Sequence, residues 1–188
     1  MSQRAEDRQK GTVEDLEELR REYPEVVSLA TKLASGMQLC KSDILREDAE
    51  AIGWDEDDAA EELKNLATNP SKRVEKYMEL FQKYYSEAHR LLERGDYTQA
   101  AEKLWGAATA LIKLHAALRG VFIAPWSHGK LHNYVTHNVE HRQAFRDMLK
   151  TAEVMHNFYE KDLDPATFKD HWEDAVRHME KVKDVLLH

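Results

Sequence analysis

Residues 88–118 read AHRLLERGDYTQAAEKLWGAATALIKLHAAL, and this stretch decides the fold. From Tyr97 to Leu118 the apolar residues are so dense that they cover most of the circumference of a helix. Gly95 indicates where the preceding helix ends, and Asp96 is a suitable N-cap for this one. A helix with so wide an apolar surface is expected at the centre of an all-α bundle.

Upstream of this stretch, the apolar residues from Val74 to Leu91 recur at spacings of three and four and predict an amphipathic helix. The turn signal Asn-Pro-Ser at residues 69–71 marks a domain boundary, and Ser71 can serve as the N-cap of the helix. Residues 1–70 are then expected to form a separate acidic helical region, with about the first 11 residues disordered.

Downstream, a helical pattern runs from an N-cap at Ser127 to about residue 158 and leaves open whether a break falls near Thr136. Asp164 followed by Pro165 marks the start of the last helix. Together with the two helices before Gly120, these patterns predict an antiparallel bundle of four or five helices over residues 71–188.

The composition excludes several classes of protein. Glycine and proline together number only 11 of 188 residues, which argues against an all-β fold. The single cysteine excludes an internal disulfide framework and a cysteine zinc cluster. No apolar run reaches the roughly 20 residues that span a bilayer, and the polar N-terminus is not a signal peptide, so a cytoplasmic location is expected.

Charge is distributed unevenly along the chain. Residues 1–70 carry 9 basic and 18 acidic side chains, whereas residues 71–150 carry 13 basic and 8 acidic ones. The middle of the chain is therefore expected to present a basic face. The acidic N-terminal region is expected either to pack over this face or to compete with the ligand that binds there. Sequence-specific DNA binding is not expected, because the helix that begins at Asp55 opens with four acidic side chains that would repel phosphates.

Residues 95–106 resemble the archaeal PaREP family, whose members are four-helix bundles related to the HEPN superfamily. In that family a Gly-Asp-Tyr turn and an Ala-Glu-Lys-Leu-Trp-Gly helix recur together, as residues 95–97 and 101–106 do here. The Ser-His-Gly at residues 127–129 is similar to the family's pattern before its third helix. The resemblance covers about residues 74–185 and implies a HEPN-like bundle that dimerises and binds RNA or protein.

Many HEPN proteins are ribonucleases that use an arginine and a histidine four to six residues apart. No arginine of this chain is followed by a histidine at that spacing. The nearest candidate pairs Arg119 with His128 or His132 for acid–base catalysis, and this divergent ribonuclease is the alternative to a non-catalytic module.

The basic face is expected to bind phosphate groups of RNA or a nucleotide. Its candidate residues combine cations with histidines and one tryptophan: Lys113, Arg119, Trp126, His128, Lys130, His132, Arg142 and Arg146. These residues predict a ligand-binding face, and the surplus of aromatic residues predicts a homodimer.

A third interpretation of the sequence is a bundle that binds a metal ion. His128 and His132 are four residues apart and would lie on the same face of a helix, as would His137 and His141. Such a pair can hold zinc or a similar ion if a third ligand joins it, and Glu140 and His115 are the possible donors. The favoured interpretation remains a module without a cofactor that engages RNA, a nucleotide or a protein partner.

Overall fold

The computed structural model describes residues 53–64, 70–121, 128–157 and 164–187, with scattered positions between 20 and 50. These residues form six α-helices and no strand. The helices are α4 (Glu56–Lys64), α5 (Pro70–Glu93), α6 (Tyr97–Leu118), α7 (His128–Asn138), α8 (Arg142–His156) and α9 (Pro165–Leu187). The predicted all-α class is confirmed. The expected disorder of the first residues and the expected N-cap Ser127 lie outside the described part of the chain.

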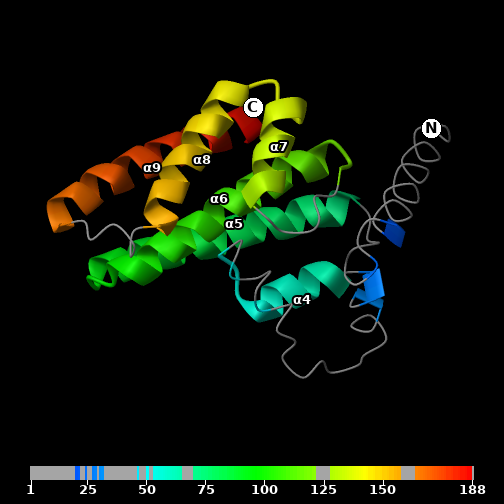
Figure 1. Cartoon of the computed structure of the whole chain (residues 1–188), viewed down its shortest axis with the longest axis horizontal. Helices are drawn as coiled ribbons and strands as arrows, with labels where there is room; N and C mark the ends of the chain where they lie inside the picture. The colour runs from blue at the N-terminus through cyan, green and yellow to red at the C-terminus, as the bar shows by residue number, and fades with distance from the viewer. Residues whose placement is uncertain are drawn as a thin grey trace.

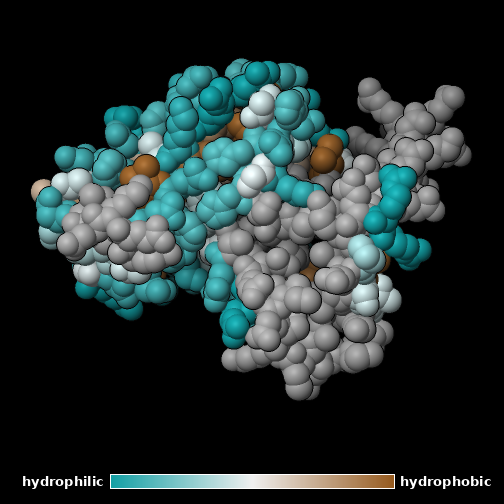
Figure 2. Space-filling model, in the orientation of Figure 1, coloured by the Kyte–Doolittle hydropathy of each residue, from teal (hydrophilic) through white to brown (hydrophobic). Residues whose placement is uncertain are grey.

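Helix α6 lies at the centre of the bundle, as its apolar circumference predicts. All its residues from Leu104 to Ala117 are buried. Helix α5 runs beside it as the other arm of a hairpin, and α8 and α9 also pack on it (Figure 1). The face that Figure 2 shows is mostly hydrophilic, with apolar side chains visible only in small separate areas. Among the described helices, none combines the length and apolarity that crossing a membrane would require.

Local sequence signals set most of the helix ends. After α5 the N–H of Asp96 donates to Leu91 O at 3.0 Å and that of Gly95 donates to Leu92 O at 2.9 Å. Such a pair of hydrogen bonds ends a helix and requires one residue in the left-handed backbone conformation. Gly95 adopts that conformation, with φ 76°. Gly120 ends α6 in the same way, with φ 76°.

Two boundaries differ slightly from those expected. Helix α5 begins at Pro70 and so includes Ser71, because a proline without an N–H fits the first turn. The helical pattern after residue 127 does break, at residues 139–141, and so gives the separate helices α7 and α8. Asp164 caps α9 as expected, because its Oδ1 accepts from the N–H of Ala166 at 2.8 Å.

The acidic segment before α5 packs directly on the hairpin at a contact between two glycines. A side chain at Gly106 would collide with the carbonyl oxygen of Gly53. A side chain at Gly53 would come within 2.8 Å of Glu102 O, and the φ of Gly53 is 68°. The indole N–H of Trp54 then donates to Gly106 O at 3.1 Å, so the backbone leading into α4 lies against α6.

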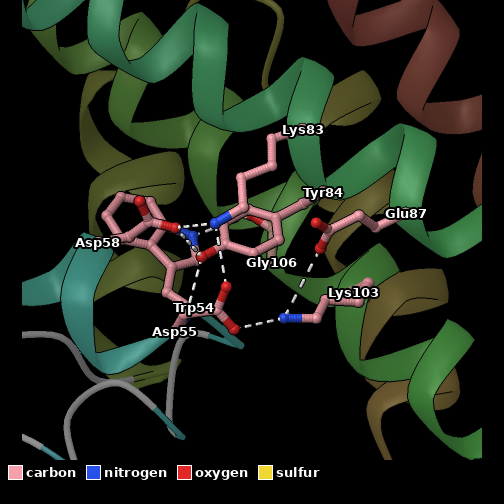
Figure 3. A network of polar contacts seen from close by, with 8 residues as sticks. All are labelled: Trp54, Asp55, Asp58, Lys83, Tyr84, Glu87, Lys103 and Gly106. Atoms are coloured by element: carbon pink, nitrogen blue, oxygen red, sulfur yellow. Dashed lines mark hydrogen bonds and ion pairs between the residues drawn. The ribbon is translucent and has the colours of Figure 1, made fainter.

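Carboxylates of this segment meet lysines of the hairpin (Figure 3). Asp55 contacts Lys83 at 3.0 Å and Lys103 at 2.6 Å, while Asp58 accepts from Lys83 and from the hydroxyl of Tyr84 at 2.6 Å. Although burial raises the pKa of Asp55, the bonds from Lys103 and Lys83 outweigh it and leave that pKa below its ordinary value. Residues 53–64 are therefore joined to the bundle by charge as well as by apolar contact.

A fully buried ion pair completes this contact. The ammonium of Lys113, a residue only 1% exposed, lies 2.7 and 2.6 Å from the two carboxylate oxygens of Glu62. The hydroxyl of Tyr77 donates to the same carboxylate, and the ring of Trp54 lies 4.5 Å from the ammonium. Burial and the charge of Glu62 raise the pKa of Tyr77 well above its ordinary value, so the phenol stays a donor.

Lys113 was expected on an exposed basic face, and this expectation was wrong. Its position in the apolar run of α6 points it into the core, where only a buried carboxylate can balance its charge. The α4 segment packs over Lys83, Lys103 and Lys113, and of these three only Lys113 belongs to the expected basic face. That the acidic region covers this face stays a prediction.

Replacing Lys113 alone should leave the Glu62 carboxylate buried without its cation. We expect Lys113→Met to lower the free energy of unfolding by about 3 kcal/mol, measured by urea denaturation. The double variant Glu62→Leu/Lys113→Met should cost less than the single one, because it leaves no unpaired charge. Lys72→Met, at an exposed position of α5, is the control. Equal losses in the single and double variants would contradict a buried pair.

The contact between the two glycines gives a second expectation. Gly106→Ala should lower the free energy of unfolding by roughly 1–3 kcal/mol, because the added methyl group forces the backbone at Gly53 away from α6. Gly129→Ala is the matched control, since no atom lies within 4 Å of a side chain added there. A shared unfolding midpoint for the two variants would show that the close approach does not exist.

Candidate functional site

Two histidines of α7 share one carboxylate of α8. His128 Nδ1 and His132 Nε2 lie 3.2 and 2.8 Å from the same oxygen, Oε1 of Glu153. The four-residue spacing places both rings on the side of α7 that faces α8. The two histidine side chains are 34% and 38% exposed, so solvent reaches them.

Two more titratable groups lie beside this trio. The ring of His156 in α8 is 5.2 Å from that of His128, and its Nδ1 is 3.1 Å from Glu102 Oε2. That N···O contact is short but not aligned as a hydrogen bond, and it is an ion pair only when His156 is protonated. The buried indole of Trp105 stacks on the rings of His128 and His156 at 4.6 and 5.4 Å. We call Glu102, His128, His132, Glu153 and His156 the histidine cluster.

The shared carboxylate fixes how the two α7 imidazoles are oriented. The hydrogen bond from His128 lowers the pKa of Glu153 below its ordinary value despite burial, and His132 adds to this effect. An ionised carboxylate only accepts, so each nitrogen that faces it carries a hydrogen. His128 Nε2 and His132 Nδ1 are then the positions at which these rings take up a further proton.

Three cations follow one another along α8. Arg142, Arg146 and Lys150 are four residues apart and all exposed, and we call them the cation stripe. Successive members are about 6 Å apart along the helix axis. Within the described residues, no carboxylate forms an ion pair with any of the three. Asp147, the acidic residue between them, instead accepts from Gln143 at 2.7 Å.

The cation stripe leads to the histidine cluster. Lys150 precedes Glu153 by three residues, which makes them neighbours on the helix surface. Arg146 precedes Glu153 by seven residues, close to two turns, and so lies on the same side of α8 about 10 Å away.

The structure does not bring Arg119 to His128. The guanidinium of Arg119 donates to Glu140 Oε1 at 2.7 Å, beyond the far end of α7. His128 instead stacks on Trp105, which lies 14 residues before Arg119 on α6, or about 20 Å along the helix axis. The pair expected for a divergent ribonuclease is therefore separated by most of the length of α6.

The other candidate metal ligands lie apart from His128 and His132. His115 is buried, bonds the hydroxyl of Tyr134 at 2.8 Å, and has its pKa lowered by burial. Glu140 pairs with Arg119, and His137 and His141 are exposed at the end of α7 and in the turn after it. In the ranges that the structure describes, no three His, Cys, Asp or Glu side chains form a metal-binding group.

Two further residues of the expected binding face are still to be placed. Lys130 is half-buried on α7, and Trp126 lies outside the described residues. The binding roles assigned to the exposed candidates stay predictions.

Sequence reasoning missed the residues that complete the site. The four-residue spacing of Lys150 from Arg146 was a signal that could have added it to the binding face. Glu102, Glu153 and His156 carried no comparable signal, because their partners are more than twenty residues away in the chain.

Comparison with known proteins now adds to this geometry. No curated protein and no solved structure matches the chain. The model of the archaeal PaREP1/PaREP8 family matches residues 76–179, which include α6, α7 and α8 with both the cation stripe and the histidine cluster. The resemblance seen in the sequence is thereby confirmed, and the chain belongs to the archaeal PaREP1/PaREP8 family.

Proposed function

We propose that the chain is a non-catalytic, HEPN-like binding module that holds single-stranded RNA along α8. The cation stripe carries this proposal. Its three exposed cations span about 12 Å and can each neutralise a phosphate of an extended strand. A row of cations favours a polyanion over a mononucleotide, because one nucleotide cannot reach all three positions.

Several other cations of the described bundle pair with carboxylates. Lys83, Lys103 and Lys113 are paired with carboxylates of the α4 segment. On α9, Arg177 pairs with Asp174 and Lys183 pairs with Glu180. Within the described residues, exposed cations for which no ion pair is seen also occur at the end of α5 and on α9, for example Arg90, Arg94 and Lys181. Among the described helices, only α8 carries three such cations in a row at four-residue spacing, and this row supports the proposal that a phosphate backbone binds there.

The homodimer remains a prediction, but most of the aromatic residues that suggested it are not at the surface. Of the aromatic residues that suggested a dimer, Tyr77, Phe81, Tyr84, Trp105 and Trp172 are buried in the core of one chain. Sedimentation at tens of micromolar decides between a monomeric and a dimeric module. The RNA site proposed here needs only one chain.

The cation stripe can be tested by charge removal. We expect Arg142→Gln/Arg146→Gln/Lys150→Gln to weaken binding of a labelled single-stranded RNA at least about tenfold at low salt. The slope of log affinity against log salt should become shallower by about 2, because three phosphate contacts are lost and each releases about 0.7 counterion from a single strand. Fluorescence anisotropy over a range of salt concentrations measures both quantities.

The matched control removes three cations from other surfaces. Lys72→Gln/Lys169→Gln/Lys181→Gln makes the same change in net charge at exposed positions of α5 and α9. Equal weakening in the two triple variants would mean that only net charge matters, and the proposed site on α8 would be abandoned.

A divergent ribonuclease is the second candidate, because two solvent-accessible imidazoles share Glu153. A pair of imidazoles in different protonation states can supply a base and an acid for phosphodiester cleavage. This candidate uses His128 and His132 without Arg119.

Product sizing separates the two candidates. We expect 5′-labelled single-stranded RNA to stay intact when it is incubated with the full chain. Cleavage that is lost in His128→Ala and retained in His171→Ala, with both variants folded by circular dichroism, would establish the nuclease instead.

A further inference from the structure

Protonation of its imidazoles would reverse the charge of the histidine cluster. With neutral imidazoles its net charge is −2, from Glu102 and Glu153. With His128, His132 and His156 protonated it becomes +1. Histidine is the side-chain type that changes charge between about pH 5 and 8. The hydrogen bonds from His128 and His132 keep the pKa of Glu153 below its ordinary value, so the Glu153 carboxylate stays ionised between about pH 5 and 8. The change in charge of the cluster therefore comes from its imidazoles.

The position of this charge change matters because the cluster lies at the end of the cation stripe. Lys150 is a surface neighbour of Glu153, and Arg146 is about 10 Å from it along the helix. These separations are comparable with the Debye length of about 8–10 Å at 0.1–0.15 M salt. A phosphate held at Lys150 therefore experiences the charge of the cluster.

The groups that face the cluster come from three helices. Helix α6 contributes Glu102 and the uncharged indole of Trp105, and α7 contributes His128 and His132. From α8 come Glu153 and His156, with Lys150 beside them on its exposed side. Lys103, which follows Glu102 in sequence, is directed to Asp55 at 2.6 Å instead.

We infer that the histidine cluster is a proton-dependent phosphate subsite that extends the cation stripe. Protonated His128 and His132 are solvent-accessible donors that a phosphate oxygen can reach, and they lengthen the cationic surface beyond Lys150. When the imidazoles are neutral, Glu102 and Glu153 repel the same phosphate. This inference rests on the proposed RNA site and adds that the site holds RNA more tightly in mildly acidic conditions.

The experiment compares RNA affinity at pH 5.5 and pH 8.0 at one low ionic strength. The probe is a fluorescently labelled single-stranded oligoribonucleotide, and the protein is the full chain. We expect affinity to be about tenfold or more higher at pH 5.5. For His128→Gln/His132→Gln, the ratio of its own affinities at pH 5.5 and pH 8.0 should fall to within about twofold of one, because the groups that add positive charge are gone.

A second variant moves affinity in the opposite direction. Glu153→Gln should raise affinity at pH 8.0 several-fold, because it removes the repelling charge and keeps the shape of the side chain. A purely structural carboxylate would give a weaker complex or no change. The matched control is His171→Gln/His178→Gln on α9, which should retain the pH dependence of the wild type.

The outcomes separate this inference from the proposed function. Binding that depends on Arg142, Arg146 and Lys150 but does not change with pH would overturn the subsite alone. The subsite would equally be overturned if His128→Gln/His132→Gln kept the pH dependence of the wild type, or if Glu153→Gln gained no affinity. Absence of binding at both pH values would overturn the RNA site and the subsite together.

Discussion

Helix α6 is apolar around nearly its whole circumference, so it has to be covered on nearly every side before the chain gains from folding. The α5 arm of the hairpin covers one side, and α8 and α9 cover others. Helix α7 covers a further side through His128 and Tyr134, and the segment that leads into α4 covers another, where Trp54 lies against Gly106. This covering also places Lys113 inside the core, so Glu62 must come with α4 to balance it. The acidic segment is therefore an integral part of the folded bundle.

Features that depend on neighbours in sequence could be predicted. Gly95 and Asp96 indicated the turn between α5 and α6, and Asp164 indicated the start of α9, because caps are satisfied by residues within one turn. The central position of α6 was also predictable, since its apolar density is a property of that helix alone.

Pairings between distant residues could not be predicted. Glu62 and Lys113 are 51 residues apart, and no spacing rule connects them. The place of Lys113 between Ile112 and Leu114 in the densest apolar run did indicate burial, but not its partner. Glu153 likewise joins His128 and His132 only because α8 folds back along α7. Arg119 and His128 are only nine residues apart in sequence. They lie near opposite ends of α7, because α7 begins beside Trp105 and ends near Arg119.

Charge divides the surface of the bundle into two kinds of region. Carboxylates of the α4 segment pair with Lys83, Lys103 and Lys113 of the hairpin, whereas the three cations of the cation stripe form no ion pair with a carboxylate among the described residues. The histidine cluster lies at the end of the cation stripe and can add to its charge or oppose it. We propose that a phosphate backbone binds at α8, because there three exposed cations follow one another at four-residue spacing.

The most direct test of this account is to locate bound RNA by photo-crosslinking. Single-stranded RNA containing 4-thiouridine would be cross-linked to the full chain at low salt, and the modified peptides identified by mass spectrometry. The account predicts cross-links within residues 128–156, which contain the cation stripe and the histidine cluster. Cross-links confined to α5 or α9 would contradict it, because they would place the RNA on surfaces whose cations are already paired or scattered.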